Sequence, residues 1–206
     1  MSAPAIRDAG LVQTLTSQTC PLATMEGAVV LPGGVTIDSS VAYDGANTSF
    51  ETLIRAGWVL AKNTSSGKYV PCKRSQANGA GSSSAALTVD NAAAFKAGDA
   101  LQIGSTTGTI SSVNYSTNVI TLTATKSWSD NDVVYCSTNG TGTPTCVLGE
   151  DVDLYQTDTR AVADCTAGVV YLAGTLKSDR VYGDLAAMRA VSGNLITKNF
   201  NVDTDI

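Results

Sequence analysis

The chain has 206 residues, of which 43% are hydrophobic, and its net charge is −5 with no histidine. That share of hydrophobic residues is enough to build a buried core, which argues against global disorder. Nucleic-acid binding needs a basic stripe that replaces phosphate counterions, whereas the basic residues here are few and scattered, so we expect no nucleic-acid partner.

The composition favours a mainly β protein. Only 15% of the residues are charged, so Thr, Ser, Asn and Gly must cover much of the surface. These residues, together with Val and Ile, favour strands and turns over exposed helices. We therefore predict a β-rich fold with one or two short helices.

The first 50 residues predict an extended N-terminal arm. Pro4, Pro21, Pro32 and the pair Gly33 and Gly34 punctuate the segment too densely for long elements. Parts of such an arm can order only against a partner. The start of the arm also lacks a basic region followed by an apolar stretch, so we expect no secretory signal.

Residues 51–78 contain the first clear core signal, in Ile54, Trp58 and Leu60. Residues 58–62 and 68–71 are β-prone runs, and they flank a turn at 64–67 that contains Ser-Ser-Gly. Two such runs around such a turn predict a β-hairpin.

Residues 79–142 predict a small β-domain inserted into the host domain. Flexible loop compositions border it at 78–84 and 137–144. Between them lie short strand-like runs at 86–90, 100–103, 107–113, 118–124 and 132–136. In the fourth run Ile120, Leu122 and Ala124 alternate with threonines, which is typical of a half-buried strand. Several short strands with tight turns favour a small barrel or sandwich.

Residues 143–206 then return to the host domain, which we expect to consist of 51–78 and 143–206. Runs at 146–149 and 168–173 predict strands, and 195–198 predicts a closing strand. Residues 184–191 predict a helix that Asp184 caps at its start and Gly193 and Asn194 end.

The sequence offers no standard catalytic or metal-binding machinery. Without histidine the usual general acid–base and nucleophile–histidine arrangements are excluded. The acidic stretch at 150–153, with Asp158 and Asp164, could in principle form a glycosidase carboxylate pair or a calcium site. It lacks the pattern of a calcium loop, so we interpret it as an acidic surface loop. We expect no enzyme activity, no cofactor and no metal.

Five cysteines at irregular spacing include no Cys-x-x-Cys pair. They indicate buried, reduced thiols, although a bridge between Cys136 and Cys146 across a loop stays open. No apolar run approaches the roughly 20 residues of a membrane-spanning helix, so we expect no membrane partner.

Four segments of the host domain resemble the lambda-type bacteriophage head decoration proteins. In chain order they read Ala-Gly-Trp-Val-Leu-Ala-Lys (56–62), Gly-Lys-Tyr-Val-Pro (67–71), Val-Leu-Gly-Glu-Asp-Val-Asp (147–153) and Gly-Val-Val-Tyr (168–171). The residues that carry the match are Gly57, Val59, Gly67, Lys68, Tyr69, Val70, Pro71, Gly149, Glu150, Asp151 and Asp153. The family joins the second and third segments by a short loop, whereas here residues 73–146 intervene.

The resemblance implies a β-tulip or barrel host fold and a structural function. Such proteins bind the outer surface of an expanded phage head, commonly as homotrimers, and bridge subunits of the major capsid protein. The resemblance also implies synthesis in the bacterial host cytoplasm and a final place on the virion. An N-terminal arm can add a strand to a capsid sheet. The arm residues that we expect to contact the capsid are Pro4, Ile6, Leu11, Val12 and Leu15.

The alternative is a receptor- or glycan-binding fibre or adhesin module on the virion surface, with the inserted domain as its recognition part. That reading expects aromatic side chains, such as Trp128, on an exposed face of the insert, where they would stack on a surface glycan.

Overall fold

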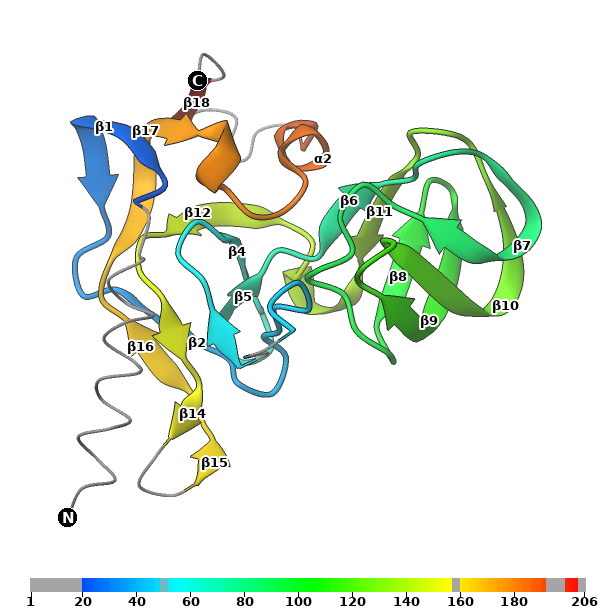
Figure 1. Ribbon diagram of the computed structural model, residues 1–206, viewed down its shortest axis with the longest axis horizontal. Helices are drawn as coiled ribbons and strands as arrows, with labels where there is room; N and C mark the ends of the chain where they lie inside the picture. Colours follow the sequence, from blue (N-terminus) through cyan, green and yellow to red (C-terminus); the bar gives the residue numbers. More distant parts are fainter. Residues whose placement is uncertain (1–19, 49, 51, 157–159, 192–198, 204–206) are drawn as a thin grey trace.

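The computed structural model describes residues 20–48, 50, 52–156, 160–191 and 199–203 (Figure 1). The protein is mainly β, which confirms the predicted fold class. Strands of the larger sheet occupy one side of the molecule in Figure 1, and those of a six-stranded sheet occupy the other.

The larger sheet, here called the host sheet, has eight strands in the order β1-β17-β12-β4-β5-β2-β16, with β18 beside β17. Their bounds are β1 Leu22–Val30, β2 Val35–Ile37, β4 Val59–Lys62, β5 Tyr69–Pro71, β12 Pro144–Leu148, β16 Cys165–Ala167, β17 Val170–Lys177 and β18 Phe200–Asp203. Two small ladders pair β3 (Leu53–Ile54) with β13 (Val152–Asp153) and β14 (Tyr155–Gln156) with β15 (Ala161–Val162). The 3-10 helices are η1 (Thr138–Gly140) and η2 (Ser178–Arg180).

Two strands of the host sheet come from the segment expected to be an arm. β1 pairs antiparallel with β17, and β2 pairs with both β16 and β5. Val35 and Ile37 of β2 are buried in the core, so burial holds this segment to the sheet. Gly34 has a φ of +66°, and a Cβ there would lie 1.9 Å from the Ala167 carbonyl oxygen. The glycines that suggested an extended arm instead allow a close turn between β1 and β2.

The predicted hairpin is confirmed as β4 and β5, which pair antiparallel with Lys62 opposite Tyr69. Within it, the Asn63 amide donates to the Lys68 carbonyl at 2.8 Å. The predicted core residues Ile54, Trp58 and Leu60 are fully buried.

The six-stranded sheet, here called the inserted module, spans residues 74–136 in the order β6-β11-β8-β9-β10-β7. Its strands are β6 Arg74–Gln76, β7 Gly81–Thr88, β8 Ala100–Ile103, β9 Thr106–Asn114, β10 Val119–Trp128 and β11 Val133–Cys136. The sheet thus begins and ends several residues before the limits of 79 and 142 that loop composition suggested. Its own buried cluster is Ala77, Leu87, Val89, Ala92, Phe95, Leu101, Ile103, Ile110, Ile120, Leu122, Trp128 and Val134.

The alternation expected along β10 stops after Leu122. Ile120 and Leu122 are buried as expected, but Ala124 is exposed. The pairing of β10 with β9 shifts register between Thr121 and Leu122, and its pairing with β7 shifts again after Thr121. A bulged strand no longer keeps the two-residue period, which is why the pattern failed there.

The predicted helix is α2 (Leu185–Arg189), shorter than the expected 184–191. The Asp184 side chain caps it by accepting from the Ala187 amide at 2.9 Å. The expected closing strand at 195–198 and its preceding Gly193 and Asn194 lie outside the described residues; β18 follows them.

The inserted module joins the host sheet through two neighbouring strands. The Cys136 amide donates to the Lys73 carbonyl at 2.9 Å, so the chain enters and leaves the module side by side. Lys73 is 1% exposed and its ammonium pairs with Asp99 at 2.7 Å. Asp184 at the start of α2 also accepts from the Ser75 hydroxyl at 3.0 Å and the Gln76 amide at 2.9 Å. These polar ties fix β6 against the host part of the chain.

Candidate functional site

The segments that resemble decoration proteins meet in space. The Gly57 amide donates to the Leu148 carbonyl at 2.7 Å, and the Gly149 amide donates to the Val169 carbonyl at 2.8 Å. A Cβ on Gly57 would lie 2.1 Å from the Arg180 carbonyl oxygen, and Gly57 has a φ of +98°. Glycine is therefore required where the segments cross. Val59 and Val70 are buried in the host sheet beside this crossing.

The acidic stretch at 150–153 is half-buried, which corrects the expectation of a solvated surface loop. Glu150 accepts from the amides of Gly168 and Val169, and Asp151 accepts from the Ala56 amide at 2.6 Å. Burial raises the pKa of Asp151, against the lowering effect of the Ala56 amide.

Asp153 completes this set of backbone ties. It accepts from the Tyr155 amide at 2.8 Å and from the Thr52 hydroxyl at 3.4 Å. The acidic residues hold loop amides in place because each carboxylate offers the acceptors that those amides need. Their sequence pattern could not show this role, since every partner except the Tyr155 amide lies at least 18 positions away.

Lys68, one of the matching residues, ties the β4–β5 turn to the loop before β16. Its ammonium pairs with Asp164, which also accepts from the Ser39 amide at 2.8 Å. The hydrogen bond from Lys68 lowers the pKa of Asp164 to about 2. The same pairing raises the pKa of Lys68.

Asp38 anchors the next turn. Burial pushes its pKa up, but hydrogen bonds from the Ser40 and Ser66 hydroxyls, both 2.6 Å long, outweigh burial and the pKa is lowered. Asp38 and Asp164 are therefore both ionised at neutral pH, where their carboxylates accept these hydrogen bonds.

A buried ionic cluster was not found from the sequence. Asp44 is fully buried and accepts from the Arg55 guanidinium at 2.7 and 2.9 Å and from the Trp58 indole at 2.9 Å. Arg55 in turn lies 4.0 Å from the centre of the Tyr182 ring. Asp44 stands in a stretch without strand or helix pattern, so only the folded chain reveals it. The cluster fixes the loop after β2 against β4.

The most exposed apolar surface lies on β1, the edge strand of the host sheet. Large hydrophobic side chains exposed in the described residues are Met25, Val29, Val30, Phe50 and Val162. Three of them, Met25 (63% exposed), Val29 (49%) and Val30 (41%), are on β1, and we call them the β1 patch. An edge strand also presents unpaired backbone groups that another chain can pair with.

A bulge divides this edge. From Thr24 to Val29, β1 advances five residues while its partner β17 advances only two, from Thr175 to Ala173. Gly27, with a φ of +71°, lies in the surplus segment, and the exposed Glu26 stands beside it. A bulge and a charge at an edge limit indiscriminate pairing, so the β1 patch is restricted to a matching partner.

The inserted module does not present the aromatic residue that glycan stacking was expected to use. Trp128 is only 8% exposed, and its indole donates to the Gly79 carbonyl at 3.0 Å. It packs over Gly81, where a Cβ would lie 2.3 Å from the indole ring. The size and apolar area of Trp128 place it in the core of the module.

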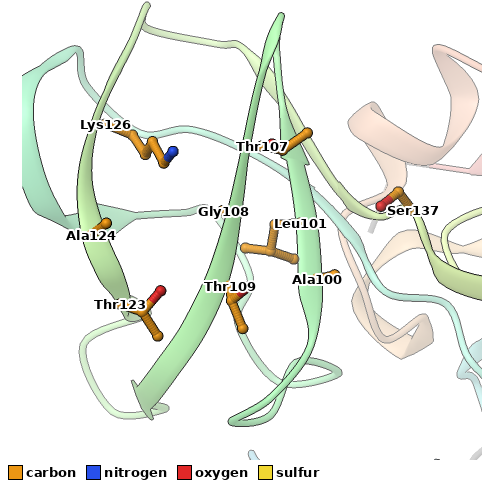
Figure 2. Close-up of a pocket in the computed structure, with 9 residues that line it drawn as sticks. All are labelled: Ala100, Leu101, Thr107, Gly108, Thr109, Thr123, Ala124, Lys126 and Ser137. Atoms are coloured by element: carbon orange, nitrogen blue, oxygen red, sulfur yellow. The ribbon is translucent and has the colours of Figure 1, made fainter.

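The module instead has a cavity of about 340 Å³ on β8, β9 and β10 (Figure 2). A second cavity, of about 300 Å³, lies where the module meets the host sheet. It is lined in part by Lys73, Asp99 and Cys136. Lys73 and Asp99 pair with each other there, so their charges are already used.

The described residues were compared with the requirements of a metal site, a membrane-spanning helix and a disulfide bridge. No group of three potential metal ligands comes together there, and no helix there is long and apolar enough to cross a membrane. Cys136 and Cys146 are both buried and free, so the bridge left open by the sequence is not formed. The arm residues Pro4, Ile6, Leu11, Val12 and Leu15 lie outside the described residues.

Comparisons with protein-family models, with curated proteins and with solved structures found no match.

Proposed function

We propose that this protein is a decoration protein that binds the outer surface of a tailed-phage head and stabilises the shell by bridging subunits of the major capsid protein. Support comes from the four matching segments. The first two segments are separated from the last two by residues 72–146, yet their strands β17, β12, β4 and β5 are neighbours in the host sheet.

The observation that carries the proposal is the β1 patch. An edge strand with Met25, Val29 and Val30 exposed offers side chains and backbone groups to a flat or extended partner. In the sequence β1 begins seven positions after Leu15, the last of the N-terminal residues that we expect to contact the capsid.

A structural function of this kind needs no chemistry. A homotrimer presents identical patches that match a local three-fold position of a shell. Binding to the expanded shell alone stabilises that shell by mass action. The acidic balance of the chain suits a surface that faces solvent rather than packaged DNA.

The test is cosedimentation of the full chain with expanded heads that lack their own decoration protein. The double variant Val29→Lys/Val30→Lys places charges on the patch, and burying an unpaired charged group costs at least about 1–3 kcal/mol. We expect it to bind at least about tenfold more weakly than the unmodified chain. Val162→Lys is the matched control, since Val162 is 47% exposed on β15, away from β1.

Two results would overturn the proposal. The first is a chain that fails to bind expanded heads and stays monomeric in light scattering. The second is an equal loss of binding in the β1 variant and in the Val162 control, which would remove β1 as the contact. Circular dichroism of each variant establishes that the fold is kept.

A receptor- or glycan-binding module was the alternative. Trp128, the aromatic residue on which that reading relied, is buried. The alternative therefore needs a different site, one without aromatic stacking.

A further inference from the structure

Strands β9 and β10 separate within the inserted module. Their ladder ends where Leu122 pairs with Ile110. Before Ile110, β9 pairs with β8, from Thr106 to Thr109, whereas after Leu122 the pairing of β10 is with β7, as at Lys126 and Ser84. The two strands therefore diverge from Ile110 and Leu122, and Figure 2 shows the wedge between them. We call this wedge the β9–β10 slot.

Backbone groups of β9 face the slot. The Ile110 amide donates to Asp99, and the Ile110 carbonyl accepts from Gly98, each at 2.9 Å, so Ile110 points its backbone groups toward the β8 side. Successive residues of a strand direct these groups to opposite sides. Thr107 and Thr109 therefore direct theirs toward β10. A Leu122–Ile110 bridge whose Ile110 groups face β8 joins Thr109 to Thr123, so the groups of Thr107 are the ones that lie beyond the ladder. They are a donor and an acceptor that a ligand can use.

The side chains of the slot are polar and small. The cavity of about 340 Å³ is lined by the hydroxyls of Thr107, Thr109 and Thr123, and by Lys126. Gly108 lies between Thr107 and Thr109, and a Cβ there would contact the buried Leu122 at 3.4 Å. In Figure 2, Lys126 and Thr123 point from β10 toward β9. The volume is at the lower end of the range for small-ligand sites.

Lys126 brings a charge that the protein leaves unused. The ion pairs of the described residues join Arg55 to Asp44, Lys68 to Asp164 and Lys73 to Asp99, and none involves Lys126. The module's other lysine, Lys96, is engaged: it donates to the Ser40 carbonyl at 3.0 Å. An ammonium that points into a hydroxyl-lined cavity without a carboxylate partner favours a ligand with an anionic group.

We propose that the β9–β10 slot binds a carboxylated saccharide unit, with Lys126 on the carboxylate and the threonine hydroxyls and the Thr107 backbone groups on the sugar hydroxyls. Threonine hydroxyls both donate and accept, as sugar hydroxyls do. An apolar ligand would find Leu101 as the one large apolar side chain of the lining, and that residue is buried. The site is separate from the β1 patch, because eight of its nine lining residues lie on the module and the ninth, Ser137, follows it directly.

The test uses the full chain on an array of carboxylated and neutral glycans, followed by calorimetric titration of sialyllactose against lactose. We expect retention of carboxylated glycans and a preference of at least about tenfold for sialyllactose, since a hydrogen bond to a charged group contributes about 1.5–3 kcal/mol. Lys126→Gln should remove most of that preference. Lys177→Gln, the same change of charge on β17 of the host sheet, should leave it unchanged.

A second variant tests the cavity itself. Ala124 lines the slot and is exposed, so Ala124→Phe fills space without touching the core. It should abolish binding while the thermal midpoint stays within about 2 °C, as surface substitutions usually change stability by less than about 0.5 kcal/mol. Retention of no glycan, equal retention of neutral and carboxylated glycans, or unchanged binding by Lys126→Gln would each overturn the proposal.

Discussion

The host sheet and the inserted module differ in topology. The host sheet brings together segments that are far apart in the chain, as in the pairing of β2 with β16. The module is a run of neighbouring strands, in which β8, β9 and β10 follow one another along the chain and in the sheet. Both regions have apolar cores, and in both a carboxylate accepts from loop amides, as Asp151 does from Ala56 and Asp130 does from Gly79. The comparison therefore separates long-range from local strand pairing, with similar packing in each.

One tryptophan lies in each region and makes the comparison measurable. Trp58 is fully buried in the host part, and Trp128 is buried in the module. Variants that keep only one of them, Trp58→Phe or Trp128→Phe, report unfolding of one region by fluorescence.

The largest effect is expected for Asp44→Ala. It leaves the partly buried Arg55 guanidinium and the Trp58 indole without their acceptor. Breaking a buried ion pair costs about 3–5 kcal/mol. In urea titrations the Trp58 midpoint should move to lower urea, and the free energy of unfolding should fall by that amount. Asp179→Ala, which changes an exposed aspartate, should alter the free energy of unfolding little. An unchanged midpoint would show that the cluster adds no stability.

A loss of about 3–5 kcal/mol is also expected for Phe95→Ala, but in the other region. Phe95 is fully buried in the module's cluster, so its removal leaves a cavity. The urea midpoint of the Trp128 signal should fall, and the midpoint of the Trp58 signal should fall less. Thr121→Ala, on the exposed face of β10, serves as the control. Equal shifts of both signals would mean that the two regions unfold as one unit.

An intermediate effect is expected at the joint. Asp184 caps α2 and also accepts from Ser75 and Gln76 of the module, so Asp184→Ala should cost about 1–3 kcal/mol. The two tryptophan transitions should then separate further. Asp184→Asn keeps an effective cap and should lose less. Identical behaviour of the two variants would exclude the capping role.

The smallest effect is expected from the surface pair of Lys68 and Asp164, both about one-third exposed. The pKa of Asp164 is about 2 in the folded chain, against roughly 3.9 when unfolded. A lowered pKa stabilises the fold above the unfolded value, and that contribution is lost as the pH falls from about 4 toward 2. Exposure limits it to below about 1 kcal/mol. Thermal midpoints of wild type and Asp164→Asn should differ at pH 6 and converge near pH 2; a constant difference would contradict this.

The sequence predicted best what depends on neighbours along the chain. The hairpin of β4 and β5, the strands of the module and the Asp184 cap follow from two-residue alternation, turn residues and capping preferences. These are local properties, so a linear pattern contains them.

What the sequence missed depends on contacts between distant residues. β2 has only three residues, and its partner β16 lies more than 120 positions away. Nothing near Asp44 indicates that Arg55 and Trp58 will meet it. The β9–β10 slot arises from register shifts, and those reflect how strands compete for partners in a curled sheet rather than the preference of any one residue.

The side-by-side entry and exit of the module, at Lys73 and Cys136, has a consequence for engineering. A hydrogen bond already closes the chain across this point, so a replacement for residues 74–136 needs only ends that lie side by side to connect to the host. It must also replace Ala93 and Ala94, which pack in the host core, and the contacts of Ser75 and Gln76 with Asp184. An engineered payload that keeps these residues could be displayed on the host sheet.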